Sequence, residues 1–232
     1  MNGTILSVEH LMMHFGGIKA LNDVNLDVQR GSITALIGPN GAGKTTVFNC
    51  LTGFYKASGG NILFNARNRT TNVIQVLGQK FQPDDWIHPA QLGQRLFYKM
   101  FGGTHLVNRA GLARTFQNIR LFREMSYGQQ RRLEIARAMC TGPEMICLDE
   151  PAAGLNPVET HKLSNIIRFL RDHHGITVLL IEHDMGMVME ISDDIIVLDH
   201  GDVIARGKPE QIQHDEKVIA AYLGTDESEV NL

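Results

Sequence analysis

The segment GPNGAGKTT combines glycines, one lysine and two threonines in the pattern G-x-x-x-x-G-K-[ST]. Glycines let successive backbone amides turn inward around a phosphate, and the start of a following helix adds partial positive charge. We expect Lys44 to reach the β and γ phosphates and Thr45 to bind Mg²⁺. The residues expected to surround the phosphates are Gly38, Pro39, Asn40, Gly41, Ala42, Gly43, Lys44, Thr45 and Thr46.

Two carboxylates stand at the end of the apolar run MICLD, which is followed by Glu150. A buried strand would bring Asp149 to the carboxyl edge of a sheet, where open α/β sheets place their ligands. We expect Asp149 to hold Mg²⁺ through water and Glu150 to act as general base on a water facing the γ-phosphate. Two ordinary surface carboxylates are the alternative, which the phosphate-binding pattern makes much less favourable.

His183 follows another apolar run, TVLLIE, and the same reasoning places it at the end of a sheet strand. A histidine there can donate a hydrogen bond to the γ-phosphate. The remaining histidines, including His173 and His174, are interpreted as ordinary surface or core residues.

These side chains need a sheet to position them, and the pattern of apolar residues predicts one. Val24, Leu26 and Val28 alternate with polar residues, as in a half-buried strand. The runs SITALIG, MICLD, TVLLIE and DIIVLD are continuous and suit strands buried on both faces of a mostly parallel sheet.

Helical patterns alternate with these strands. One helix is expected from Lys44 to about Thr52. Another is marked by Asn156 as N-cap and Pro157 at the first helical position, followed by apolar residues at helical spacing, namely Leu163, Ile166, Ile167 and Leu170. The predicted fold is α/β, a P-loop nucleotide-binding core in a single domain over residues 1–232.

Composition narrows the function. The chain has 232 residues, 43% hydrophobic, with a net charge of −3, so it can bury a full core but offers no basic surface for nucleic acid. Cys50, Cys140 and Cys147 have no zinc or disulfide spacing, which fits a reducing cytoplasm. No apolar run reaches the roughly 20 residues that cross a bilayer, so we expect membrane association only through a partner.

The motifs IGPNGAGKTT, RTFQN, YGQQRRLEIARAM, LDEPAAGLNP and LLIEHDM occur in the order found in the nucleotide-binding subunits of ABC transporters. More narrowly, MMHFGGIKALNDV, TVFNCLTGFY, LFREM and AYLG resemble the ATPase subunits of branched-chain amino-acid importers. This resemblance implies ATP and Mg²⁺ as ligands and an N-terminal antiparallel β subdomain beside the core.

The resemblance also assigns roles to residues outside the phosphate loop. Phe15 matches the aromatic that stacks on adenine, although an ordinary strand-end phenylalanine is an open alternative. Gln117 matches the glutamine that contacts Mg²⁺ and the attacking water. Ser126, Gly128 and Gln129 match the signature loop that caps ATP in the opposite subunit; a simple capped basic helix is the alternative.

The implied assembly is a head-to-tail dimer with a second nucleotide-binding subunit, identical or related. It would bind transmembrane permease subunits at the inner face of the cell membrane and, through them, act with a periplasmic solute-binding protein. The implied location is cytoplasmic and peripheral to the membrane, with no nucleic acid partner.

The junction over residues 117–126 departs from the family. Only residues 118 to 125 separate Gln117 from Ser126, whereas the family has a helical subdomain in this region. The subdomain is expected to be missing between Met125 and Ser126. Eight extended residues span at most about 30 Å. The natural protein carries a segment that this sequence omits, or the segment was removed, or evolution lost it; we favour the first two.

The stretch 66–110 is longer than in the family and is interpreted as an insertion. It holds Trp86 and apolar residues near helical spacing: Leu92, Leu96, Phe97, Met100 and Phe101. A small amphipathic helix packed on the core is the favoured interpretation, and extra contact surface for a membrane or partner subunit is the alternative. Its first part, NARNRTTNVIQVLGQKFQPDD, reads as polar and mobile.

Taken together, the sequence predicts an ATP-hydrolysing subunit of an ABC importer, with branched-chain amino acids as the expected solute and ATP-dependent dimerisation as the driving step. Two alternatives stay open. One is a nucleotide-binding module whose hydrolysis is impaired by the missing subdomain, and the other is a soluble ABC-type ATPase not linked to transport.

Overall fold

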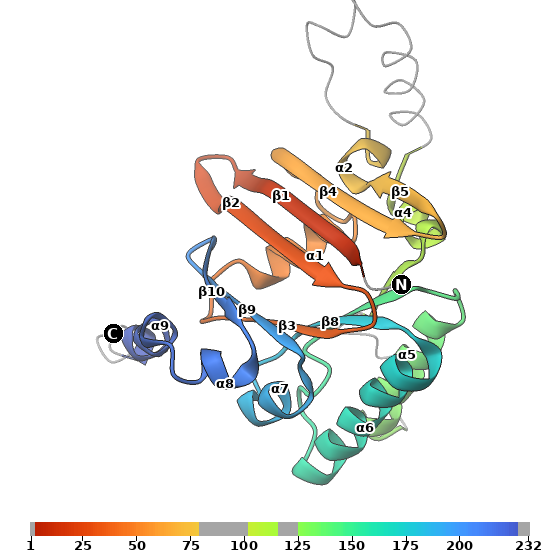
Figure 1. Ribbon diagram of the computed structural model, residues 1–232, viewed down its shortest axis with the longest axis vertical. Helices are drawn as coiled ribbons and strands as arrows, with labels where there is room; N and C mark the ends of the chain where they lie inside the picture. Colours follow the sequence, from red (N-terminus) through yellow and green to blue (C-terminus); the bar gives the residue numbers. More distant parts are fainter. Residues whose placement is uncertain (1–2, 79–101, 116–124, 227–232) are drawn as a thin grey trace, which may run out of the picture.

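The computed structural model describes residues 3–78, 102–115 and 125–226. Within these ranges the chain forms two β-sheets with helices between and below them (Figure 1). The predicted combination of an α/β core with an N-terminal antiparallel sheet is confirmed.

The smaller sheet is antiparallel and has the strand order β2-β1-β4-β5. Its strands are β1 (Thr4–Phe15), β2 (Ile18–Gln29), β4 (Gly59–Ala66) and β5 (Arg69–Asn72). Alternate residues point into the core, since Val24, Leu26 and Val28 are all buried as their spacing predicts.

The larger sheet has the order β10-β9-β3-β8-β7-β6. Its strands are β3 (Ile33–Ile37), β6 (Leu112–Arg114), β7 (Met145–Asp149), β8 (Thr177–Ile181), β9 (Asp194–Asp199) and β10 (Asp202–Gly207). All neighbours are parallel except β9 and β10. β3, β7 and β8 are buried along their whole length, which explains their unbroken apolar sequences.

Helices cover both faces of this sheet. α1 (Lys44–Leu51) lies between the two sheets, where Val47, Phe48 and Leu51 pack in one core with residues of β1, β2 and β4. The opposite face is covered by a second core. That core includes residues of α5 (Tyr127–Met139), α6 (Pro157–His174), α7 (Met185–Ile191), α8 (Pro209–Ile212) and α9 (Glu216–Asp226).

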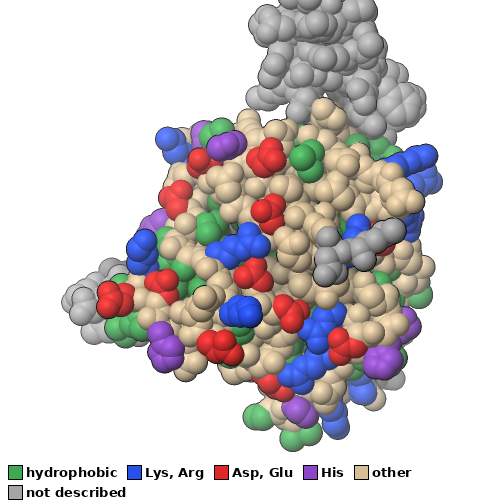
Figure 2. Space-filling view, viewed as in Figure 1, with side chains coloured by type: hydrophobic (Ala, Val, Ile, Leu, Met, Phe, Trp, Pro, Cys, Tyr) green, Lys and Arg blue, Asp and Glu red, His purple; other side chains and the backbone are tan. Residues whose placement is uncertain are grey.

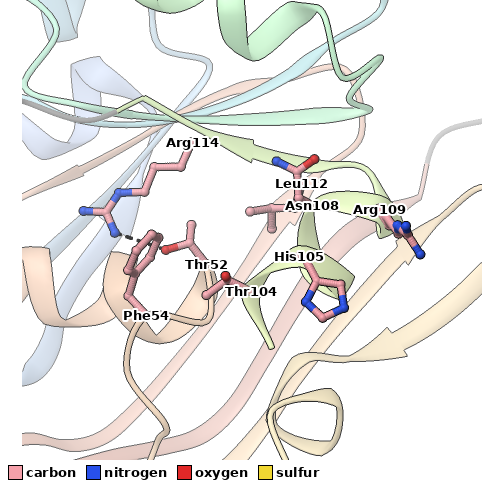
Figure 3. Close-up of a pocket in the computed structure, with 8 residues that line it drawn as sticks. All are labelled: Thr52, Phe54, Thr104, His105, Asn108, Arg109, Leu112 and Arg114. Carbon is pink, nitrogen blue, oxygen red and sulfur yellow. Dashed lines mark hydrogen bonds between the residues drawn. The ribbon is translucent and has the colours of Figure 1, made fainter. Parts of the chain in front are cut away.

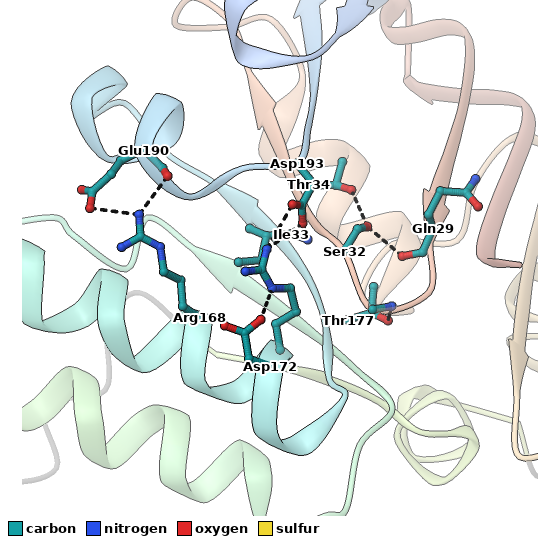
Figure 4. A network of polar contacts seen from close by, with 11 residues as sticks. Gln29, Ser32, Ile33, Thr34, Arg168, Asp172, Thr177, Glu190 and Asp193 are labelled. Atoms are coloured by element: carbon teal, nitrogen blue, oxygen red, sulfur yellow. Dashed lines mark hydrogen bonds and ion pairs between the residues drawn. The ribbon is translucent and has the colours of Figure 1, made fainter. Parts of the chain in front are cut away.

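The ends of α6 are fixed as the sequence predicts. Asn156 accepts a hydrogen bond from the Glu159 amide, and the Glu159 carboxylate accepts one from the Asn156 amide, which closes a capping box. Near its other end, Arg171 pairs with Asp193, which also accepts the Ile33 amide at 2.7 Å (Figure 4). Asp193 therefore joins α6 to the start of β3, and β3 leads into the phosphate loop.

The interpretation of residues 66–78 as polar and mobile is wrong. β5 pairs with β4 through its backbone, and α2 (Val73–Val76) follows it, capped by Asn72. Val73, Ile74 and Val76 are buried against the first core. The physical reason is that an edge strand needs only backbone pairing, so polar side chains do not prevent it.

The stretch 66–110 also contains α4 (Thr104–Ala110), which leads into β6. Trp86 and the apolar residues Leu92, Leu96, Phe97, Met100 and Phe101 lie outside the described residues, so the predicted amphipathic helix there stays a prediction. At the other junction, β6 ends at Arg114 and α5 begins at Tyr127, so only residues 115 to 126 connect them.

Several expectations from composition can be compared with the molecular surface and interior. Acidic and basic side chains are interspersed on the face seen in Figure 2. All three cysteines are free, and burial raises the pKa of Cys50 and Cys147 to about 12, so both remain neutral thiols. Among the described residues, every helix is too short or too polar to span a bilayer.

Candidate nucleotide-binding site

The phosphate loop runs from the end of β3 to the start of α1, as the sequence predicts. Lys44 is 6% exposed, and its ammonium donates to the carbonyls of Gly38 at 2.6 Å and Pro39 at 2.8 Å. Burial lowers the pKa of Lys44, and the nearby Glu150 carboxylate partly opposes that shift. The ammonium is thus held within the loop, while Asn40, Gly41 and Thr45 are exposed at its surface.

Two glycines of the loop are required by close packing. Gly38 has φ +148°, and a Cβ there would lie 1.9 Å from the carbonyl oxygen of Leu198. Gly43 has φ +101°, and a Cβ there would lie 2.9 Å from the Leu21 side chain. Both positions need the left-handed backbone and the missing side chain that only glycine provides.

The loop has a further neighbour that sequence reasoning missed. Tyr222, on α9 near the C-terminus, makes a hydrogen bond with the backbone of Gly38, and its burial raises the pKa of its phenol. The motif AYLG contains Tyr222, but no local spacing relates it to a loop so far away in the chain.

Glu150 and His183 meet at the carboxyl ends of β7 and β8. The His183 Nε2 atom lies 2.8 Å from Glu150 Oε1, and both side chains are partly exposed. Glu150 has a positive φ of 46°, an uncommon conformation for a residue with a long side chain. A general base held by a strained backbone beside an imidazole can orient a water and accept its proton.

Glu182, just before His183, is 3% exposed, and the sequence predicted no role for it in the site. Its carboxylate accepts hydrogen bonds from the amide of Ala152 at 2.6 Å and from that of His183 at 3.1 Å. Burial raises its pKa, although these backbone bonds oppose the shift. Glu182 therefore ties the end of β8 to the turn that follows Glu150.

Asp149 is 6% exposed at the end of β7, as predicted, but its partner was not predicted. Arg114, at the end of the neighbouring strand β6, donates to Asp149 Oδ2 at 2.7 Å. The sequence signal was limited to a lone arginine in the motif RTFQN, because only the β6–β7 pairing shows which carboxylate it meets.

The remaining predicted residues belong to β1, to the start of α5 or to the part of the chain that the structure does not describe. Phe15 is 42% exposed at the end of β1, and its ring packs edge-on against Tyr55 at 5.3 Å, so it is not a core residue. Gln117 lies outside the described residues, and its predicted role stays a prediction.

Ser126, Gly128 and Gln129 lie together at the start of α5. Ser126 caps the helix by accepting the Gln129 amide, and the Gln129 side chain accepts the Ser126 amide. A Cβ on Gly128 would lie 2.8 Å from Glu159 of α6, so the two helix starts are packed against each other. This confirms a capped helix; presentation of its start to a second subunit stays a prediction.

The residues fit Mg²⁺ held together with a nucleotide. In the described part of the chain no group of three or more His, Cys, Asp or Glu side chains could hold a metal ion. Mg²⁺ in phosphate-transfer sites uses few protein ligands, and one carboxylate with one hydroxyl suffices beside substrate phosphates. Asp149 and Thr45, the predicted ligands, are a carboxylate and a hydroxyl of this kind, and their role stays a prediction.

A strand-loop-helix with a buried lysine, followed by a carboxylate pair and a histidine at adjacent strand ends, defines a P-loop nucleotide-binding domain. The family model for ABC transporters matches residues 21–153, and the model for branched-chain amino acid ATP-binding cassette transporters matches residues 203–228. The chain belongs to the ABC transporter family and is an ATPase of the ABC type.

The chain aligns with its curated relatives over nearly their full length. The high-affinity branched-chain amino acid transport ATP-binding protein LivG of Escherichia coli K12 is 41% identical, over 97% of this chain and 99% of the relative. BraF of Pseudomonas aeruginosa is 40% identical with the same coverage, and a probable LivG of Archaeoglobus fulgidus is 35% identical.

Solved structures agree in fold. A nucleotide-free ATP-binding cassette from an ABC transporter has a TM-score of 0.74 and 27% identity, with 95% of this chain and 99% of that chain covered. An ATP-binding cassette in its ADP conformation has a TM-score of 0.70 and 32% identity, with 96% and 99% covered.

The alignments also show a difference in length. The match to the Escherichia coli protein runs over 283 residues and that to the Archaeoglobus fulgidus protein over 253, whereas this chain has 232. These relatives therefore contain residues that have no counterpart in this chain.

Proposed function

We propose that this chain is the ATP-binding and ATP-hydrolysing subunit of an importer for branched-chain amino acids. The observation that carries the hydrolytic part is the Glu150–His183 contact of 2.8 Å beside the buried Lys44. The solute class rests on the names of the relatives, because nothing in an ATP site contacts the transported molecule.

Each side chain has a role in this proposal. Lys44 and the amides of residues 38–46 bind the phosphates, and Thr45 and Asp149 hold Mg²⁺. When bound, Mg²⁺ neutralises charge between the β and γ phosphates. Glu150 accepts a proton from the attacking water. His183, which contacts Glu150 in this structure, would donate its N–H to the γ-phosphate when the nucleotide is bound.

The proposed assembly involves a second nucleotide-binding subunit and permease subunits. Ser126, Gly128 and Gln129 would cap ATP bound in a second nucleotide-binding subunit, and Phe15 would stack on adenine in its own site. Permease subunits would hold the pair at the inner face of the membrane, and Gln117 would sense both permease and water. We propose this arrangement from the family resemblance and the exposed position of the start of α5.

Substitution of Glu150 by Gln tests the hydrolytic role. It keeps the size of the side chain but removes the base, so turnover should fall by about 10²–10⁴-fold while ATP binding persists. Steady-state phosphate release and equilibrium binding of the same preparation measure both. Unchanged turnover would exclude Glu150 as the base.

A second candidate function is a nucleotide-binding module with impaired hydrolysis. The short connection of residues 115 to 126, and the longer relatives, favour it. Without a helical subdomain the signature residues lose supporting contacts, although the phosphate loop is intact. Steady-state ATPase activity, with and without permease subunits, separates the two, and intact mass of the purified protein shows whether further residues are present.

A further inference from the structure

Arg114 binds three side chains from two different elements. Its Nη2 atom donates to Asp149 at 2.7 Å, and its Nη1 atom donates to Asn49 at 2.6 Å and to Thr52 at 3.1 Å. Asp149 ends β7, whereas Asn49 and Thr52 belong to the last turn of α1 and its C-cap. One guanidinium therefore connects the carboxylate strand to the helix that begins with Lys44 and Thr45.

The surroundings hold this guanidinium in place. The Arg114 side chain is 8% exposed and that of Asp149 is 7% exposed. The Arg114 Cζ atom lies 5.4 Å from the centre of the Phe54 ring and 5.9 Å from that of Phe48. Arg114, Thr52 and Phe54 line a cavity of about 440 Å³. Figure 3 shows these three side chains together.

The geometry has a direct chemical consequence for Asp149. The hydrogen bond from Arg114 engages Oδ2 and restrains the rotation of the carboxylate, which would hold Mg²⁺ through water. A planar guanidinium can bond to two partners in fixed directions at once, which a lysine ammonium on a flexible stem cannot reproduce.

We propose that Arg114 is a positioning residue that holds Asp149 and α1 in one arrangement, and thereby sets the magnesium-dependent part of nucleotide affinity. This rests on the proposed ATP site. Arg114 itself contacts neither phosphate nor metal in this proposal. It acts indirectly, because the hydrogen-bond partners of a metal-binding carboxylate fix the orientation of its oxygen atoms.

The test compares Arg114→Lys with wild type by titration of a fluorescent ATP analogue, once with Mg²⁺ and once with a chelator. We expect Arg114→Lys to weaken binding with Mg²⁺ by roughly 10–100-fold and to leave binding without the metal nearly unchanged. Equal loss under both conditions, or no loss under either, would overturn the proposal.

A matched control is Arg30→Lys. Arg30 also pairs with a carboxylate, Glu144, and donates to a backbone carbonyl, but it lies before β3 at the opposite end of the sheet. Both titrations of Arg30→Lys should match wild type.

Thermal melting of each nucleotide-free variant monitors folding. Asn49→Ala is the second variant, to be used if Arg114→Lys does not fold, because it removes one hydrogen bond of Arg114 and no charge. Asn49→Ala should show a smaller loss, again only with Mg²⁺.

A double-mutant cycle separates this inference from the proposed function. Asp149→Asn alone should remove the magnesium-dependent affinity, and Arg114→Lys in that background should then add no further loss. A further loss of the full size would show that Arg114 acts independently of Asp149, which contradicts the proposal. Absence of any nucleotide binding by the wild type would instead refute the proposed function.

Discussion

The phosphate-binding region around Lys44 and Asp149 and the start of α5 are built in different ways in this chain. Lys44 and Asp149 are each 6% exposed and are held by bonds from neighbouring strands and loops. The start of α5 is open to solvent, with Tyr127 66% exposed, and its visible support is the contact with α6. The phosphate-binding region is therefore buried and internally bonded, whereas the start of α5 is exposed.

This contrast suggests that nucleotide binding in one subunit does not depend on the start of α5. The phosphate loop draws its rigidity from β3, α1 and the β9–β10 hairpin, none of which passes through residues 115 to 126. Variants in the two regions should therefore separate binding from later steps.

Among the variants that compare these two regions, the largest expected effect belongs to Lys44→Ala. Removing a charged hydrogen-bond donor costs about 1.5–3 kcal/mol, so the dissociation constant for ATP should rise roughly 10–150-fold. Ser126→Ala is the matched variant in the other region, and single-subunit affinity should be unaffected by it. Calorimetry under conditions that keep the protein monomeric measures both; equal losses would contradict the separation of the two regions.

Glu182→Ala comes next and concerns stability. It leaves the Ala152 amide buried without its acceptor, at a cost of about 1–3 kcal/mol, whereas Glu182→Gln keeps an acceptor oxygen. The free energy of unfolding from urea titration should fall for the first variant and fall less for the second, which keeps one of the two oxygens that accept the amides of Ala152 and His183.

Glu182 also makes a contribution to the free energy of unfolding that depends on pH. Its pKa is raised in the folded protein, so the buried charge lowers stability at neutral pH, and that penalty should disappear as pH falls through the folded pKa. Glu182→Gln should flatten this contribution; an unchanged pH profile in the variant would assign it to other groups.

A smaller effect is expected for Ser126→Ala, which removes the cap of α5. Loss of such a cap costs about 0.5–2 kcal/mol. Urea titration followed by circular dichroism measures it, with Ser126→Gly as the control that should lose only about a few tenths of a kcal/mol. If Ser126→Ala is as stable as wild type, α5 does not depend on its capping box.

The smallest effect concerns Lys44 and alkaline pH. Its lowered pKa means that the ammonium loses its proton at a lower pH than an ordinary lysine does, so ATP affinity should begin to fall before the pH at which a solvent-exposed lysine titrates. Phosphate groups are already fully ionised at alkaline pH. The Lys44→Ala variant should show a flat profile, and a wild-type profile equally flat would argue against burial as the controlling factor.

The sequence predicted what local pattern determines. Unbroken apolar runs predicted the buried strands, and Asn156 and Pro157 predicted the start of α6. α2 was missed because three apolar residues after a polar edge strand are too few to show a period. The contacts of Arg114 with Asp149 and of Tyr222 with Gly38 were also missed, since both depend on which elements become neighbours.

The positive φ of Glu150 has a consequence for protein engineering. Glycine, asparagine and aspartate adopt such a backbone most readily, and β-branched residues resist it. In a library that samples every residue at this position, tolerance to heating should favour glycine and asparagine, whereas catalytic turnover should select glutamate. The two selections would rank the same clones in opposite orders, so a screen for robustness alone would discard the working enzyme.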